Sequence, residues 1–318
     1  MSDTVAAIVV TYNRKDLLIV CLEALRNQTR KPDAIYIIDN KSTDGTPELL
    51  VEKGYIDQLP DINSTSNQVI SHNITWAGNH QIQIRINYIR KFENDGGAGG
   101  FYEGMKQAYD TGYDWIWMMD DDGMADQKQL EHLLLSSNTH RIDFANALVV
   151  DINETDKLAF GLKNYKYKKE IVEKDVITNE INPFNGTLIR RSVPERIGFI
   201  KREMFIWGDE NEYFKRANTS KITIATVINS IHYHPPSKSD YGNVFPFTSR
   251  YRVLLKPNHF SQYYYRNIGY INWKYSGRKD FWVTAILYCL YFLKLFRIRE
   301  LVKFVNSYAD GKLNQYKS

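Results

Sequence analysis

The chain has 318 residues, of which 43% are hydrophobic and 25% are charged, a composition typical of a globular protein with one large domain or two smaller ones. Its formal net charge of +4 is too small to indicate nucleic-acid binding by itself. The two cysteines, Cys21 and Cys289, exclude a disulfide framework, and the first residues lack the basic and then apolar pattern of a signal peptide. We therefore expect a cytoplasmic globular protein.

The beginning of the chain alternates strand and helix patterns. Apolar residues 5–10 and 34–38 each predict a buried strand, and each strand is followed by a segment with helical spacing. This order predicts an α/β fold with a doubly wound sheet, in which ligands bind beyond the carboxyl ends of the strands. Polar residues stand at those ends: Thr11, Asn13 and Arg14 after the first strand, and Asp39 and Asn40 after the second.

A glycine-rich segment follows a further predicted strand at residues 83–90. Before that strand, residues 61–81 are polar and aperiodic, so we expect a loop there. We expect the glycine-rich segment to be a loop whose backbone approaches a ligand before a helix over residues 102–109. It has neither the Gly-Lys-Ser/Thr of a P-loop nor the GxGxxG of a dinucleotide site. The residues expected at the ligand are Asn94, Gly96, Gly97, Gly99 and Gly100.

Three consecutive carboxylates, Asp120, Asp121 and Asp122, end an apolar strand predicted at residues 115–119. Adjacent carboxylates repel one another, and a hard divalent cation such as magnesium or manganese would neutralise them. Because alternate residues of an extended segment point the same way, Asp120 and Asp122 would converge on the cation while Asp121 points elsewhere. A solvated acidic turn is the alternative.

A second acidic cluster and a pair of histidines lie further along the chain. Asp209 and Glu210 follow Trp207 at the predicted start of a helix. His234 follows a predicted strand and would be a third metal ligand, with His232 as its alternate, although a lone histidine is often structural. The ring of Trp207 would either stack on a sugar or pack in the core.

The apolar run at residues 281–296 has basic residues at both ends. At 16 residues it is shorter than the ~20 that a helix needs to span a bilayer. Two alternatives remain: the helix lies in a membrane interface, or it is buried in a C-terminal helical bundle. The flanking basic residues are Arg278, Lys279, Arg297 and Arg299.

Taken together, these stretches resemble family 2 glycosyltransferases of the GT-A fold over roughly residues 4–236. The matching motifs are Thr-x-Asn-Arg after the first strand, Asp-Asn-x-Ser-x-Asp-Gly after the second, the run of three aspartates, and a later acidic residue for the base. The glycine-rich segment and the sequence Trp-x-Asp-acid-x-Glu-Tyr from residue 207 are similar to the galactofuranosyltransferase branch, with bacterial rhamnosyltransferases as close relatives. That branch usually has Asp at the second acid, where this chain has Glu210, so the base stays open between Asp209 and Glu210.

The resemblance implies a metal-dependent inverting hexosyltransferase with manganese or magnesium as its cofactor and UDP-galactofuranose as the favoured donor. The base would take the proton of an acceptor hydroxyl as this attacks the anomeric carbon, and one direct displacement inverts that carbon. The glycine-rich segment, Asp121 and the polar residues after the first two strands would contact the donor. We assign acceptor binding to Trp207, Asn185 and Gly186.

We expect a GT-A domain over residues 1–250, with a nucleotide half to about residue 125 and an acceptor half over residues 126–250. A helical region over residues 251–318 would associate with a membrane. The expected acceptor is a surface glycan on a lipid carrier at the inner face of the cell membrane, and no nucleic-acid partner is expected. The alternatives are a dTDP-rhamnose transferase, a nucleotidyltransferase and a glycan-binding subunit without catalysis. A nucleotidyltransferase would carry a basic glycine-rich loop after its first strand. A glycan-binding subunit that had lost its catalytic activity would be expected to lack one of the metal-binding or base carboxylates.

Overall fold

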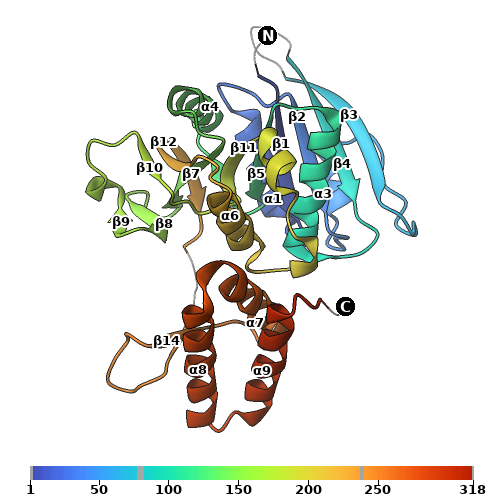
Figure 1. Cartoon of the computed structure of the whole chain (residues 1–318). Helices are drawn as coiled ribbons and strands as arrows, with labels where there is room; N and C mark the ends of the chain where they lie inside the picture. Colours follow the sequence, from blue (N-terminus) through green and yellow to red (C-terminus); the bar gives the residue numbers. More distant parts are fainter. Residues whose placement is uncertain (1–2, 77–81, 237–239, 317–318) are drawn as a thin grey trace. The chain divides into compact units, whose positions relative to one another are not determined.

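The computed structural model describes residues 3–76, 82–236 and 240–316 (Figure 1). The chain divides into two compact units that interleave along the sequence. The first unit comprises Met1–Arg202 and Ser220–Ser237, and the second comprises Glu203–Thr219 and Lys238–Ser318. Each unit is described by itself below.

The first unit is built on a 12-stranded mixed sheet. Its strands are β1 (Val5–Thr11), β2 (Ala34–Asp39), β3 (Gln68–Trp76), β4 (Ile82–Arg90), β5 (Trp115–Asp120), β6 (Met124–Ala125), β7 (Phe144–Asp151), β8 (Lys157–Leu162), β9 (Tyr165–Tyr167), β10 (Val176–Thr178), β11 (Asn185–Arg190) and β12 (Ile224–His234). The main order is β10-β12-β7-β11-β5-β1-β2-β4-β3. The central strands β5, β1, β2 and β4 run parallel, while β11 is antiparallel to both of its neighbours, β5 and β7.

Helices cover both faces of this sheet (Figure 1). They are α1 (Lys15–Arg26), α2 (Thr46–Glu52), α3 (Gly96–Thr111), α4 (Gln129–His140) and α5 (Ser192–Ile197). Short 3₁₀ turns form at Lys168–Glu170 and at Arg202–Met204, where the chain passes from the first unit to the second. The alternation along β1 shows how the layers form. Val5, Ala7 and Val9 share a core with α1, α2 and α4, and the intervening Ile8 and Val10 meet α3. The predicted α/β class with a doubly wound mixed sheet is confirmed.

Two glycines allow α3 to lie close against β1. A Cβ atom on Gly100 would stand 2.5 Å from Cγ1 of Val10, and one on Gly104 would stand 2.4 Å from Cγ2 of Ile8. Both distances are shorter than van der Waals contact, so any larger residue would push α3 away from the sheet.

Two local predictions are wrong. Of residues 61–81, expected to be a loop, Gln68–Trp76 form the edge strand β3, antiparallel to β4; residues 77–81 lie outside the described part. An edge strand exposes much of its surface, so its side chains need no apolar alternation. The glycine-rich segment is also not a loop before a helix, because α3 begins at Gly96.

The second unit is mainly helical and has an aromatic core. It contains α6 (Asp209–Thr219), the strands β13 (Asp240–Asn243) and β14 (Arg252–Leu255), α7 (Ser261–Ile271), a π-helical turn (Asn272–Ser276), α8 (Arg278–Lys294) and α9 (Ile298–Lys312). Tyr288 and Phe304 stack with ring centroids 4.6 Å apart, and Phe281 stacks on Tyr308 at the same distance. Helix α8 thus buries one face in this core.

The other face of α8 is exposed, so burial in a C-terminal bundle describes only one side of the helix, and its place in a membrane interface stays a prediction. Trp282, Ile286 and Leu290 are 55%, 55% and 42% exposed. Among the residues that the structure describes, no helix is long and apolar enough to cross a membrane.

Candidate active site

The predicted polar residues of the first unit meet at one edge of the sheet. In the parallel register, Thr11 on β1 pairs with Asp39 on β2, and Val10 pairs with Asp120 on β5. The ends of these three strands therefore lie side by side, although their residues are far apart in the sequence. This is the edge at which α/β sheets bind ligands.

Two residues from the end of β1 hold the aspartate run in place. The Thr11 hydroxyl donates to Oδ2 of Asp121 at 2.7 Å. Nη1 of Arg14 donates to Oδ1 of Asp121 at 3.2 Å and to Oδ2 of Asp122 at 2.8 Å. Asp121 is only 3% exposed and points toward β1, and Asp122 shares its contact with Arg14.

Asp122 also contacts His234, at the end of β12. Nε2 of His234 lies 3.1 Å from Oδ1 of Asp122, and Nδ1 donates to the carbonyl oxygen of Pro235 at 2.6 Å. Burial acts to lower the pKa of His234, but the hydrogen bond and charge of Asp122 outweigh it and raise that pKa above its usual value. The bond to Pro235 fixes Nδ1 as a donor, so Nε2 is the nitrogen that faces the carboxylates.

The third carboxylate, Asp120, has an unfavourable environment for its charge. Burial, together with the neighbouring Asp122 and Asp121 carboxylates, raises the pKa of Asp120 to about 8. Burial likewise raises the pKa of Asp121 to about 6, against the opposing effects of Thr11 and Arg14. A cation would relieve this excess of negative charge.

The potential metal-ligating side chains at this edge are of the types that bind divalent cations. Two carboxylates and an imidazole with a fixed tautomer are ligands that manganese accepts. Within the described ranges, however, no three His, Cys, Asp or Glu side chains are already gathered in a metal-binding cluster. Asp120, Asp122 and His234 would have to close around the ion.

His232, the alternate ligand, has a different environment. It is completely buried, with Nδ1 3.2 Å from Oε1 of Gln129, and burial lowers its pKa to about 3. A Cβ atom on Gly123 would stand 2.1 Å from Nε2 of His232, so this glycine turn lies directly on the ring. A neutral imidazole packed under the turn after Asp122 supports the shape of that turn.

The end of β2 is held by residues that the sequence patterns did not single out. Asp39 is completely buried; its Oδ1 accepts from the backbone N–H of Ser42 at 2.7 Å, and its Oδ2 accepts from the hydroxyl of Tyr88 at 2.6 Å. Arg90, at the end of β4 and 7% exposed, donates to the carbonyl oxygen of Ser42 at 3.1 Å. The sequence signal that could have indicated Arg90 is its position as a charged residue at the end of a predicted strand.

The residue before Arg14 adopts an unusual backbone conformation. Asn13 has φ of 53°, and its N–H donates to Oγ of Ser42 at 2.9 Å. Its Oδ1 accepts from the backbone N–H of Thr43 at 2.7 Å. Asn tolerates this left-handed conformation better than most residues, so Asn13 links the turns after β1 and β2.

The glycine-rich segment separates into packing and open positions. Oδ1 of Asn94 accepts from the N–H of Gly96 at 2.9 Å, and Nδ2 of Asn40 donates to the Gly96 carbonyl oxygen at 3.0 Å. A Cβ atom on Gly99 would meet the Asp95 carboxylate at 2.0 Å, whereas nothing lies within 4 Å of one on Gly97. Gly97 is therefore the glycine with open space beside it.

The predicted acceptor residues Asn185 and Gly186 lie at a bulge between β11 and β5. Gly186 has φ of 70°, and a Cβ atom there would stand 2.0 Å from Nε2 of Gln129. Nδ2 of Asn185 donates to the carbonyl oxygen of Pro183 at 3.2 Å. Close packing against Gln129 explains why a glycine is needed at position 186.

The second acidic cluster belongs to the second unit. Asp209 is 5% exposed, and Glu210 is partly exposed with Oε2 accepting from the backbone N–H of Gly208 at 2.9 Å. The Glu210 carboxylate thus turns back to the backbone just before α6. Trp207 is half-buried, with Nζ of Lys256 4.7 Å from the centroid of its ring.

Asn267 on α7 is a residue of this cluster that the sequence did not reveal. It is completely buried, and Nδ2 lies 2.9 Å from the carbonyl oxygen of Met204, 3.1 Å from that of Ile206 and 3.0 Å from that of Trp207. One side chain therefore holds the whole segment that leads into Asp209.

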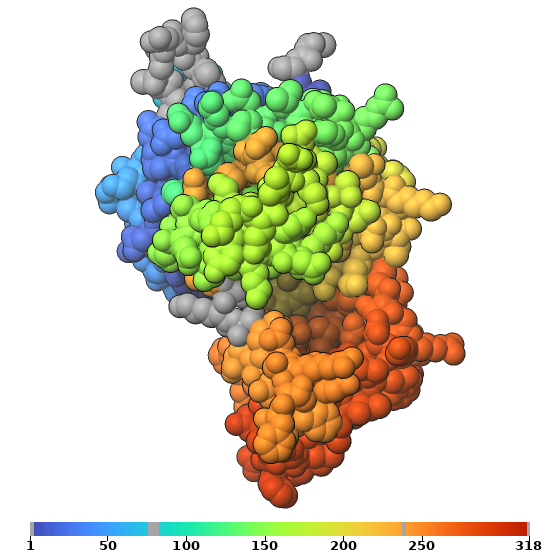
Figure 2. Space-filling view, turned by 90° about the vertical axis from the view of Figure 1, so that its left-hand side faces the viewer, coloured from blue at the N-terminus to red at the C-terminus, as the bar shows by residue number. Residues whose placement is uncertain are grey.

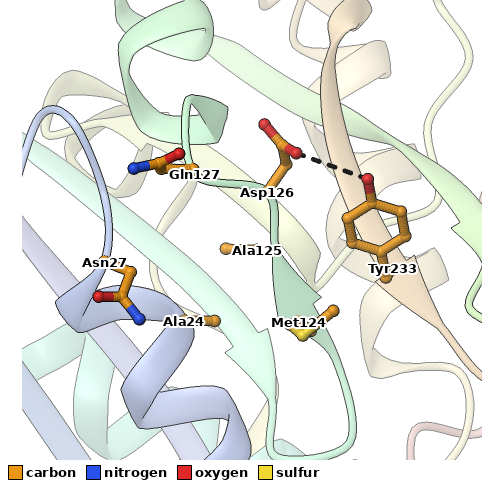
Figure 3. A pocket seen from close by; sticks show the side chains of 7 residues that line it. All are labelled: Ala24, Asn27, Met124, Ala125, Asp126, Gln127 and Tyr233. Atoms are coloured by element: carbon orange, nitrogen blue, oxygen red, sulfur yellow. Dashed lines mark hydrogen bonds between the residues drawn. The ribbon is translucent and has the colours of Figure 1, made fainter.

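A separate cavity of about 430 Å³ contains none of the predicted residues (Figure 3). Tyr233 lines it, with its hydroxyl 3.5 Å from Oδ2 of Asp126, and it lies between the two histidines in sequence. Because neighbouring residues of a strand point to opposite faces, the cavity is on the side of β12 away from His234. The lining residues are Ala24, Asn27, Met124, Ala125, Asp126, Gln127 and Tyr233.

The mixed sheet thus carries carboxylates, an arginine and a histidine at the ends of its strands. The sequence matches the family description "Glycosyl transferase family 2" over residues 6–67 and 71–198. The chain belongs to this family of glycosyltransferases.

Similar proteins carry a more specific name. The chain is 28% identical over 282 residues to galactofuranosyltransferase GlfT1 of Mycolicibacterium smegmatis, covering 85% of this chain and 83% of that protein. It is also 28% identical over 280 residues to galactofuranosyltransferase GlfT1 of Mycobacterium tuberculosis, with the same coverage.

Solved structures support the fold. TarS of S. aureus superposes with a TM-score of 0.53 at 14% identity, covering 91% of this chain and 43% of that one. TarS residues 1–349 in complex with UDP gives a TM-score of 0.53 at 13% identity, covering 99% of this chain and 93% of that one. The predicted GT-A glycosyltransferase fold is thus confirmed, while similarity at this identity does not transfer a substrate.

Proposed function

We propose that this family 2 glycosyltransferase transfers galactofuranose from UDP-galactofuranose, with inversion, to a hydroxyl of a surface glycan in a metal-dependent reaction. The observation that carries the proposal is the contact between Asp122 and His234 beside Asp120, at the edge where β1, β2 and β5 end. The mycobacterial relatives named as galactofuranosyltransferases support the sugar, and the UDP complex of TarS supports the nucleotide.

Asp120, Asp122 and His234 would hold the cation. When bound, manganese or magnesium neutralises negative charge that develops on a diphosphate leaving group. Arg14 donates to Asp121 and Asp122 and adds a second positive charge at this edge. The conformation of the Thr11 and Asp39 strand ends is fixed by buried hydrogen bonds, so the donor would meet a pre-formed surface.

Besides the cation, neighbouring backbone would contact the donor. Gly97 is our choice for a close approach of the donor, because space beside it is open. The amides of Asn13, Asn40 and Asn94 instead bond to the chain itself and would shape the site around the nucleotide.

The acceptor hydroxyl needs a base, for which we propose Glu210. Its Oε2 is bonded to Gly208, and its other oxygen has lone pairs that can accept a proton. Asp209 remains the alternate base. The ring of Trp207 would contact the acceptor sugar by stacking, together with Asn185 and Gly186.

We propose that the first 250 residues contain the nucleotide and acceptor halves, and that residues 251–318 bring the enzyme to the inner face of the cell membrane. A glycan on a lipid carrier is the acceptor that suits this location. The apolar exposed side of α8 supports the proposal.

Release of nucleotide from a panel of sugar nucleotides, with and without manganese, tests the function. We expect the full chain to turn over UDP-galactofuranose when manganese is present and to lose this activity in EDTA. If only dTDP-rhamnose is consumed, the protein is a rhamnosyltransferase. If it forms sugar nucleotides from sugar phosphates, it is a nucleotidyltransferase. If no donor is consumed with any acceptor, a glycan-binding subunit becomes the better description.

A further inference from the structure

Two aromatic side chains of the second unit project almost completely into solvent. Phe247, between β13 and β14, is 99% exposed, and Phe296, between α8 and α9, is 89% exposed. Among the described residues, no other large apolar side chain is more than 66% exposed. Contact of such rings with water is unfavourable, and several of them gathered on one surface are typical of a binding site for an apolar partner.

The two exposed turns are held next to each other. Nζ of Lys294, the last residue of α8, donates to the carbonyl oxygens of Asn243 and Val244 at 3.1 and 3.4 Å. These two residues begin the turn that contains Phe247. The hydroxyl of Tyr288 also donates to the carbonyl oxygen of Leu254 at 2.6 Å, which fixes β14 along α8. Figure 2 shows this hairpin, in orange, standing out on the surface of the unit.

An exposed apolar stripe runs along each of the two helices that flank Phe296. Its members repeat at spacings of three or four residues, which places them on one side of each helix. We define this surface as the α8–α9 face; it consists of Trp282, Val283, Ile286, Leu290 and Leu293 on α8, Leu295 and Phe296 in the turn, and Ile298, Val302 and Val305 on α9.

Basic residues alternate with apolar ones at the tip of this face. Residues 293–299 read Leu-Lys-Leu-Phe-Arg-Ile-Arg, and all seven are exposed. Arg250 and Arg252 stand on the exposed turn and strand next to Phe247. Acidic residues are fewer along α8 and α9, where they are Asp280, Glu300 and Asp310. An apolar surface with a basic border complements a layer of acyl chains beneath anionic headgroups.

We propose that the α8–α9 face and Phe247 dock on the surface of an anionic lipid bilayer. The rings of Phe247 and Phe296 enter the acyl boundary, while Lys294, Arg297 and Arg299 remain among the headgroups. This inference rests on the proposed function, which places the enzyme at the inner face of the cell membrane, and it names the surface that contacts the lipid. The contact is interfacial, since none of the described helices can span a membrane.

Flotation of the full chain with vesicles tests the docking. We expect binding to vesicles of phosphatidylcholine mixed with phosphatidylglycerol, weaker binding as salt rises, and little binding to phosphatidylcholine alone. The double variant Phe247→Ser/Phe296→Ser should bind at least about tenfold more weakly. Changing Arg297 and Arg299 to Gln should cost roughly fivefold for each charge.

A matched control separates this surface from apolar exposure in general. Leu135 on α4 in the first unit is 64% exposed, so Leu135→Ser removes a similar exposed side chain and should leave vesicle binding unchanged. In a Cys289→Ser background, an environment-sensitive dye on Phe296→Cys should shift to the blue with anionic vesicles. The same dye on Leu135→Cys should not shift.

Absence of binding by the full chain to anionic vesicles at low salt would overturn the proposal. So would self-association that Phe296→Ser abolishes in a chain that ignores vesicles, because a second copy would then cover the face. Vesicle binding and donor turnover are measured separately. If the chain binds vesicles but consumes no sugar nucleotide, the docking proposal stands and the proposed function is wrong. If it consumes a sugar nucleotide but does not bind vesicles, only the docking proposal is wrong.

Discussion

The amide nitrogen of Asn267 lies 3.0 Å from the carbonyl oxygen of Trp207, and it reaches two more carbonyl oxygens of the same segment. This contact holds backbone that would otherwise relax. Phe205 and Trp207 have φ of 65° and 59°, values that bulky residues rarely adopt. Nε of Arg266 lies 3.4 Å from Oδ1 of Asn267 and so orients the amide. The segment that leads into Asp209 and Glu210 is therefore shaped by α7.

Replacing Asn267 with Ala should destabilise the protein by about 1–3 kcal/mol, because buried carbonyl oxygens lose their donor. Turnover should fall more than donor affinity, since the proposed base is at the end of this segment. Denaturant unfolding and steady-state kinetics measure the two effects. Asn306→Ala, at an exposed position on α9, is the control and should change neither. Unchanged kinetics in Asn267→Ala would show that the hydrogen bonds of Asn267 do not position the proposed base.

The metal site predicts a stabilisation that depends on Asp122. Manganese should raise the melting temperature of the full chain, because the cation neutralises carboxylates that repel one another around Asp120. Asp122→Asn should remove this shift and nearly all turnover while the fold survives. Asp110→Asn, at a carboxylate that is 51% exposed on α3, should retain both. An unchanged manganese shift in Asp122→Asn would exclude that carboxylate as a ligand.

The two adjacent acids of α6 predict different defects. Glu210→Gln can still accept the Gly208 N–H, so stability and donor affinity should persist while turnover falls by about 10²–10⁴. Asp209→Asn should lose less turnover, with more of its defect in acceptor KM or melting temperature. Measuring turnover, donor binding and melting for both variants decides between them. If Asp209→Asn is inactive with native stability, Asp209 is the base.

Two glycines of α3 predict opposite outcomes for the same substitution. Gly100→Ala would place a methyl group 2.5 Å from Val10 and should destabilise the protein by about 1–3 kcal/mol. Gly97→Ala enters open space in the first turn of a helix, so stability should be unchanged or slightly higher. If the donor approaches Gly97, its affinity should fall in this variant alone. Thermal melting and donor titration of the pair separate packing from binding.

Local sequence patterns predicted the strand ends well. Apolar runs that stop at polar residues located Thr11, Asp39 and Asp120, and the sheet register then brought them together. The edge strand β3 was missed because its exposed surface has no apolar period. The glycine run was predicted as a loop because glycine disfavours helix, whereas here close packing on β1 outweighs that preference.

Contacts between distant segments left no signal in the sequence. Asn267 is 60 residues from Trp207, and Tyr88 is 49 residues from Asp39. Nothing in the composition around either residue indicates its partner.

The most direct test of the central claim is the product formed by the full chain from UDP-galactofuranose, manganese and a glycan acceptor, with the new linkage resolved by NMR. The account predicts a galactofuranosyl product whose anomeric configuration is opposite to that of the donor. It predicts that Glu210→Gln forms this product about 10²–10⁴-fold more slowly and that no product forms in EDTA. A product that retains the donor configuration, or equal turnover in EDTA, would contradict it.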